Sequence, residues 1–165
     1  MGVVKSVSLK DFLTQPVCAV YGPEHIKANI PHREPFLLVD EIRMLEKGKK
    51  YIGVYRARPD EYYFKGHFPG HPVMPGVLVI ESMSQAFGGA VMQDVANGKN
   101  ATLPLFLSIS EAKFRGMVCP GDLLEMPIEI LRLGRISKIY SEAYVNGKKC
   151  AQATLNFMLG DSPHE

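Results

Sequence analysis

The sequence predicts an α+β fold in which an antiparallel sheet of about six strands curls around one long central helix. Three observations lead to this prediction: one long apolar stretch without proline, strand-like segments on both sides of it, and short turns between most of those segments. A helix that is apolar around most of its circumference is enclosed rather than laid on a surface. The sheet is therefore expected to wrap around it.

The N-terminal part of the chain is expected to be irregular or partly helical. Ser8 and Asp11 have the spacing of a capped short helix. A second short helix is predicted to begin at Pro23 and to end before Pro31. We expect residues 1–22 to be an extension and residues 23–160 to form the main domain.

The central helix is predicted to begin at Gly76 and to continue for about 20 residues, as far as a polar loop at 97–103. Within the stretch 66–85, Glu81 is the single acidic residue. Small or polar residues follow this acid at helical spacing, which predicts that another part of the molecule comes close to that side. These residues are Ser84, Gln85, Gly88 and Gly89.

The strands are predicted from runs of β-forming residues bounded by turn signals. They cover 36–45, 49–59, 105–118, 122–133, 136–145 and 148–159. The first two are expected to form a hairpin around the turn 46–49, and CPGD at 119–122 is a further turn. Asn146 and Gly147 supply the positive backbone angles of a tight hairpin.

Composition and charge exclude several classes of protein. The 165 residues are 46% hydrophobic and 22% charged, with a net charge of +2. Lys and Arg are interleaved with Asp and Glu, so a nucleic-acid-binding surface is not expected. No apolar run has the length of a membrane span, and the three cysteines have no paired spacing. We therefore expect a cytoplasmic protein that does not enter a membrane.

Small basic clusters remain as possible contacts for an acidic partner. They are Lys47, Lys49 and Lys50; Lys113 and Arg115; and Arg132, Arg135 and Lys138.

The stretch GHFPGHPVMPGVLVIESMSQ, residues 66–85, carries the residues that are able to do chemistry. His67 and His71 have the spacing of a zinc-protease histidine pair, but Pro69, Gly70 and Pro72 exclude the helix which that pair requires. No cysteine or aspartate lies nearby in sequence to complete a metal site. We therefore expect no metal ion there.

Proton transfer is the alternative chemistry for this stretch. A neutral histidine is a natural base, while a carboxylate in an apolar helix tends to keep its proton and can donate it. Gly76 contributes a backbone N–H at the helix N-terminus, which suits a carbonyl oxygen that gains charge. The residues alone also allow a purely structural role. In that case His67 forms a hydrogen bond with the backbone, and Glu81 points to solvent or to a lysine.

Three segments together resemble a known family. They are PHREPFLLVDEI (31–42), GHFPGHPVMPGVLVIESMSQ (66–85) and EAKFRGMVCPGD (111–122), within a similarity from about residue 24 to 158. This pattern resembles the 3-hydroxyacyl-acyl carrier protein dehydratases of bacterial type II fatty acid synthesis, the FabZ group. The resemblance implies the hotdog fold, a homodimer with shared active sites, and a trimer of such dimers.

The resemblance also implies the site residues and the reaction. His67 would be the catalytic base and Glu81, from the other subunit, its partner, while the Gly76 N–H would polarise the thioester carbonyl. The expected reaction converts a (3R)-3-hydroxyacyl thioester on acyl carrier protein to the trans-2-enoyl thioester, without metal or cofactor. Glutamate rather than aspartate at 81 argues against the related dehydratase/isomerases.

Some features depart from the family pattern, and two other functions compete. Ser108 stands where relatives often have glycine, Leu105 where some have a tyrosine, and His71 is given no catalytic role. The competing functions are a hotdog acyl thioesterase and a non-catalytic module that binds acyl thioesters. A thioesterase would release free thiol, whereas the module would need neither His67 nor Glu81.

Overall fold

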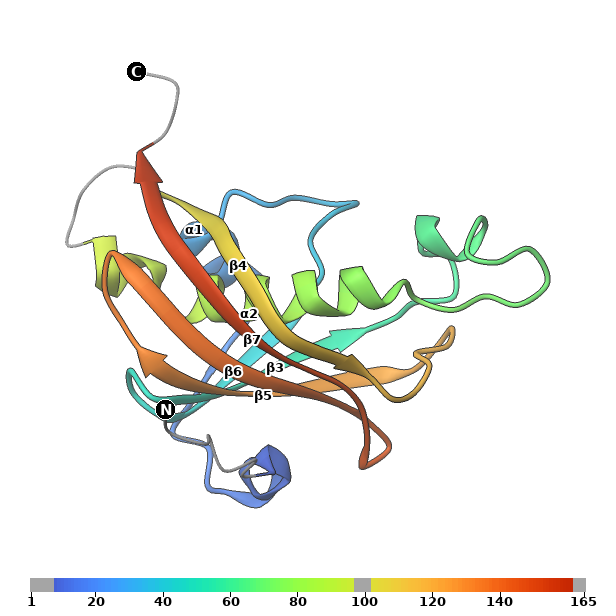
Figure 1. The fold of residues 1–165 in the computed structure, drawn as a ribbon, viewed down its shortest axis with the longest axis horizontal. Helices are drawn as coiled ribbons and strands as arrows, with labels where there is room; N and C mark the ends of the chain where they lie inside the picture. The colour runs from blue at the N-terminus through green and yellow to red at the C-terminus, as the bar shows by residue number, and fades with distance from the viewer. Residues whose placement is uncertain (1–7, 97–101, 162–165) are drawn as a thin grey trace.

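The computed structural model describes residues 8–96 and 102–161, in which a curved antiparallel sheet wraps around one long helix (Figure 1). This helix is α2, Gly76–Ala96. Residues 82–90 in its middle are all buried, as an enclosed apolar helix requires. The predicted α+β architecture is confirmed. No helix in these two ranges is both long and apolar enough to span a membrane.

The sheet has seven strands in the order β1-β2-β3-β5-β6-β7-β4, and all neighbouring pairs are antiparallel. The strands are β1 (Ala19–Tyr21), β2 (Glu41–Glu46), β3 (Lys50–Arg56), β4 (Thr102–Phe114), β5 (Leu123–Arg132), β6 (Ile136–Val145) and β7 (Lys148–Asp161). The strand beyond the predicted six is β1, whose three residues are too few to show periodicity in a sequence. Of the predicted polar loop 97–103, residues 97–101 lie outside the described ranges, and 102–103 begin β4.

The predicted short helices and turns are confirmed. The 3-10 helix η1 (Leu9–Thr14) is capped by Ser8, whose hydroxyl accepts from the Lys10 N–H at 3.3 Å. Helix α1 (Pro23–Asn29) follows, and the short 3-10 helix η2 (Tyr62–Phe64) precedes the loop that leads to α2. Asn146 and Gly147 have φ angles of 50° and 74° at the tight turn between β6 and β7.

Small residues let α2 lie very close to its neighbours. A Cβ added to Gly53 on β3 would lie 2.5 Å from the Ala86 Cβ on the helix. A Cβ added to Gly89 would lie 2.8 Å from Ile42 on β2, and one added to Gly88 would lie 2.9 Å from Ile30. The predicted close approach to the strip after Glu81 is thus made by the chain itself.

The other face of the sheet carries the N-terminal segment, and η1 lies across the sheet from α2 (Figure 1). Leu9 and Phe12 of η1 form a second apolar cluster with Leu45, Ile52, Val54 and Tyr140. The division between an extension at 1–22 and a domain at 23–160 stays a prediction, although β1 within 1–22 already pairs with β2.

A buried carboxylate ties this segment to the sheet. Glu142 on β6 is fully buried and accepts hydrogen bonds from the Leu9 N–H, the Tyr140 hydroxyl and the Lys149 ammonium, each at 2.8 Å, and from the Tyr144 hydroxyl. Burial by itself raises the pKa of the Glu142 carboxyl, but the hydrogen bonds, that of Lys149 foremost, together hold the pKa below its ordinary value. The carboxylate is therefore charged in the folded protein at neutral pH.

Replacing Glu142 with Gln should lower the free energy of unfolding by about 3 kcal/mol, because it removes one charge of a buried pair and leaves Lys149 without its anion. Urea unfolding at neutral pH measures this change. Glu46→Gln, at an exposed pair with Lys49, is the matched control and should leave the stability nearly unchanged. Equal losses in both variants would contradict the role of Glu142.

The advantage of the native Glu142 should also depend on pH. Because its folded-state pKa lies below the ordinary 4.5, its contribution is present above that value and is lost as the pH falls through the folded-state pKa. Unfolding curves of the native protein and Glu142→Gln should therefore converge in acid. A difference that is constant from neutral to acidic pH would contradict the assignment.

Candidate active site

The loop that carries His67 is held closed by its own backbone. The N–H groups of Phe68 and His71 each donate to the other residue's carbonyl at 2.9 Å, and the Val73 N–H donates to the His67 carbonyl at 2.8 Å. Gly70, with φ of +79°, takes the left-handed conformation that lets the loop turn. The Met74 N–H then donates to the Val118 carbonyl at 2.8 Å. His67 is thus fixed relative to the sheet.

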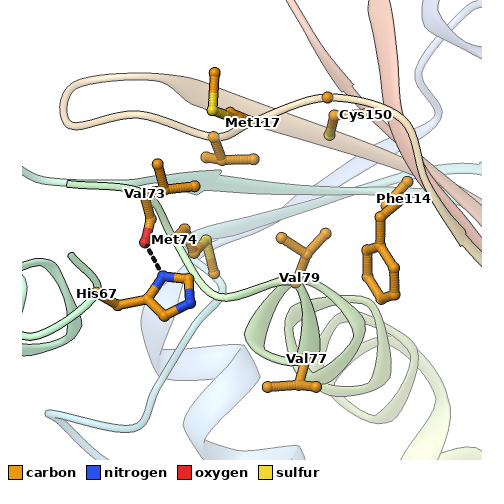
Figure 2. A pocket seen from close by; sticks show the side chains of 12 residues that line it. His67, Val73, Met74, Val77, Val79, Phe114, Met117 and Cys150 are labelled. Atoms are coloured by element: carbon orange, nitrogen blue, oxygen red, sulfur yellow. Dashed lines mark hydrogen bonds between the residues drawn. The ribbon is translucent and has the colours of Figure 1, made fainter. Parts of the chain in front are cut away.

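The contacts of the His67 ring determine its tautomer. Nδ1 lies 2.7 Å from the Val73 carbonyl oxygen, which can only accept, so Nδ1 carries the hydrogen. In the neutral ring Nε2 then keeps its lone pair, and Figure 2 shows it directed away from Val73. The alternative reading of the sequence, in which His67 only bonds to the backbone, is thus correct for its Nδ1 atom. Within residues 8–96 and 102–161 no group bonds Nε2, so its lone pair is available.

His67 and Gly76 line the same cavity, which has a volume of about 320 Å³ (Figure 2). The other lining residues are mostly apolar: Val73, Met74, Val77, Val79, Phe114, Gly116, Met117, Val118, Cys150 and Ala151. Burial raises the pKa of the Cys150 thiol to about 11, so this cysteine is a neutral part of the wall. The cavity suits an apolar chain with one polar end.

Gly76 is the first residue of α2, as predicted. The N–H groups of Leu78 and Val79 both donate to the Pro75 carbonyl, whereas the Gly76 N–H, in the first turn, has no acceptor within the helix. A Cβ at this position would lie 2.7 Å from a ring carbon of Phe114. Glycine is therefore required if backbone and aromatic ring are to form one wall of the cavity.

Glu81 of α2 contacts residues that do not line this cavity. Its Oε1 accepts a hydrogen bond from the Gln85 amide at 3.0 Å and lies 3.3 Å from Nε2 of His32. Glu81 is not among the residues that line the cavity with His67. Within one chain, then, the structure brings His67 and Gly76 together, and it places Glu81 with Gln85 and His32.

Two further histidines, His71 and His32, lie close to the candidate catalytic residues. His71 is exposed in the loop, and no three His, Cys, Asp or Glu side chains within the described ranges gather in a way that could hold a metal ion. His32, beside Glu81, was not singled out from the sequence. It lies within the motif 31–42, but nothing in its spacing indicates that it meets a residue 49 positions later.

Comparison with known proteins relates the whole site to one family. The model of the FabA-like domain family matches residues 30–154. The 3-hydroxyacyl-[acyl-carrier-protein] dehydratase FabZ of Clostridium kluyveri is 44% identical over 143 residues, covering 86% of this chain and 97% of the relative. The FabZ of Syntrophotalea carbinolica is 47% identical over 127 residues, covering 76% and 86%.

Solved structures share the fold at lower sequence identity. A chain of the dehydratase heterocomplex ApeI:P from Xenorhabdus doucetiae superposes with a TM-score of 0.72 at 19% identity, over 86% of this chain and 93% of its own. A hypothetical thioesterase from Streptococcus pneumoniae has a TM-score of 0.51 at 13% identity, over 72% and 87%. At these identities the comparison establishes the hotdog fold.

Replacing Gly76 with Ala should displace the Phe114 ring and narrow the cavity. A non-reactive acyl thioester should then bind about 5- to 150-fold more weakly, since overpacking of this kind costs about 1–3 kcal/mol. Isothermal titration with the purified variant measures the affinity. Gly66→Ala, whose Cβ would meet no atom within 4 Å, is the control, and equal affinities in both variants would contradict the role of Gly76.

Proposed function

This chain belongs to the FabA-like family, among the FabZ 3-hydroxyacyl-acyl carrier protein dehydratases, and we propose that His67, Gly76 and Glu81 carry out its reaction. The protein is a hydro-lyase that dehydrates 3-hydroxyacyl-acyl carrier protein in fatty acid biosynthesis. The observation that carries the residue assignment is the free Nε2 of His67 in the cavity that Gly76 also lines.

His67 acts as the base. Its Nε2 removes a proton from C2 of the (3R)-3-hydroxyacyl thioester, while the Nδ1 hydrogen bond to Val73 keeps the ring in the required tautomer. The Gly76 N–H donates to the thioester carbonyl oxygen, which gains negative charge as C2 loses its proton. These two effects each supply roughly two to four powers of ten in rate.

Glu81 acts as the acid. It gives a proton to the C3 hydroxyl, the C3–O bond breaks and water leaves as the trans C2–C3 double bond forms. A proton passes from His67 back to Glu81, through water, before the next turnover. The step needs no oxidant, reductant or cofactor, because proton transfers balance it completely.

Glu81 reaches this cavity from a second copy of the chain. In support, β4 is an edge strand, and its consecutive residues Leu105, Phe106 and Leu107 are 45%, 39% and 49% exposed. An isolated chain thus leaves apolar side chains of β4 partly exposed beside the unpaired edge of the sheet. We propose that two β4 edges pair in a homodimer with shared sites, three of which assemble further.

The carrier protein docks at the mouth of the same cavity. Of the three basic clusters, Lys113 and Arg115 flank Phe114, which lines the cavity next to Gly116. Both charged side chains are exposed and suit an acidic carrier domain. We propose that the enzyme acts in the cytoplasm, which agrees with the free thiols of Cys18, Cys119 and Cys150.

His67→Ala and Glu81→Gln should each lower the rate of interconversion of 3-hydroxyacyl and 2-enoyl carrier-protein thioesters by at least about a hundredfold. Enoyl absorbance and free thiol are followed separately, and thermal unfolding shows that each variant folds. The native enzyme should release no free thiol, which distinguishes it from a thioesterase. Full activity in both variants would overturn the proposal.

Mixing the two inactive variants should restore activity if each site takes His67 from one chain and Glu81 from the other. After joint unfolding and refolding, about a quarter of the native rate should return, because half of the random dimers are mixed and each keeps one intact site. The native protein taken through the same procedure is the control. A mixture no more active than its components would show that each site belongs to a single chain.

A further inference from the structure

His32 is placed to act on the carboxylate that the reaction uses. It lies in the segment between α1 and β2, and its Nε2 is 3.3 Å from Oε1 of Glu81. Both side chains are largely buried, with 22% and 17% of their surface exposed. Because both side chains are shielded from bulk water, neighbouring protein groups rather than water molecules set their orientation.

The two oxygens of Glu81 have different surroundings. Oε1 accepts from the Gln85 amide at 3.0 Å and faces His32, whereas Oε2 accepts no hydrogen bond from any residue in the described ranges. Gln85 is itself fixed, because its Oε1 accepts from the Leu38 N–H at 2.7 Å and its amide donates to the Phe36 carbonyl at 2.8 Å. One oxygen of Glu81 is thus held in place and the other is available.

The second nitrogen of the His32 ring supports a functional reason for this histidine. Nδ1 is buried and has no hydrogen-bond partner in the described parts of the chain. The Oε1 atom of Glu81 accepts hydrogen bonds, so a hydrogen on Nε2 of His32 suits this contact. A phenylalanine at position 32 would fill the same space and leave no polar atom unsatisfied. The contact of Nε2 with Glu81 therefore explains why this residue is a histidine.

We propose that His32 is a positioning residue for Glu81. Its Nε2–H donates to Oε1, which directs Oε2 towards the C3 hydroxyl of the substrate and stabilises the carboxylate left after proton transfer. Since His32 acts through Glu81, its loss slows turnover more than it weakens substrate binding. This inference rests on the acid role proposed for Glu81.

The test compares variants that differ in their ability to donate to Glu81. His32→Phe removes the donor and should lower kcat about 10- to 100-fold, with KM changed less than about twofold, as expected for one lost hydrogen bond to a charged group. His32→Gln places an amide N–H at a similar reach and should restore kcat to within about fivefold of the native value. His32→Asn, one methylene shorter, should behave like His32→Phe.

Controls separate this inference from the proposed function. His25→Phe, the same change on α1 where the ring stacks on Tyr21, should leave kcat unchanged. In a Glu81→Gln background, His32→Phe should cause no further loss. The positioning role would be overturned if His32→Phe and His32→Asn both kept the native kcat. It would also be overturned if His32→Phe lowered kcat as much in the Glu81→Gln variant as in the native enzyme. An active Glu81→Gln single variant would instead overturn the function assigned to Glu81.

Discussion

The close contact between α2 and the sheet is the constraint on which the rest of the molecule depends. Gly53 and Ala86 allow the helix to lie against β3 at a distance that a larger side chain would prevent. A sheet that must cover so much of one helix has to curve around it. The same contact fixes the position of the helix N-terminus. Gly76 and Glu81 therefore stand on a rigid element rather than on a mobile loop.

The two proposed catalytic groups, His67 and Glu81, have different surroundings. His67 lies in a loop whose backbone groups satisfy one another, and a carbonyl takes its Nδ1 hydrogen. Glu81 lies on a buried helix, where Gln85 and His32 face only one of its oxygens. These contacts leave a lone pair of His67 and one oxygen of Glu81 available for the base and acid roles that we propose.

Fold and sequence carry different information about this protein. Its architecture is shared with the hypothetical thioesterase from Streptococcus pneumoniae as well as with a chain of a dehydratase heterocomplex, at identities of 13% and 19%. The relatives at 44% and 47% identity, by contrast, are all named as FabZ dehydratases. A curved sheet around a helix supplies a cavity and a helix N-terminus, which suit any acyl thioester. The side chains placed around them decide which bond breaks.

Local sequence patterns were sufficient to predict the central helix, most strands and the turns, because apolar periodicity and residues such as Asn146 and Gly147 act over short distances. These patterns also indicated His67, Gly76 and Glu81, which lie within one short motif. Only the tertiary structure showed β1, the Glu142 cluster, and the separation of Glu81 from the cavity within a chain. It alone brought His32 to Glu81. Contacts between distant segments depend on how the sheet closes around α2, which no local pattern encodes.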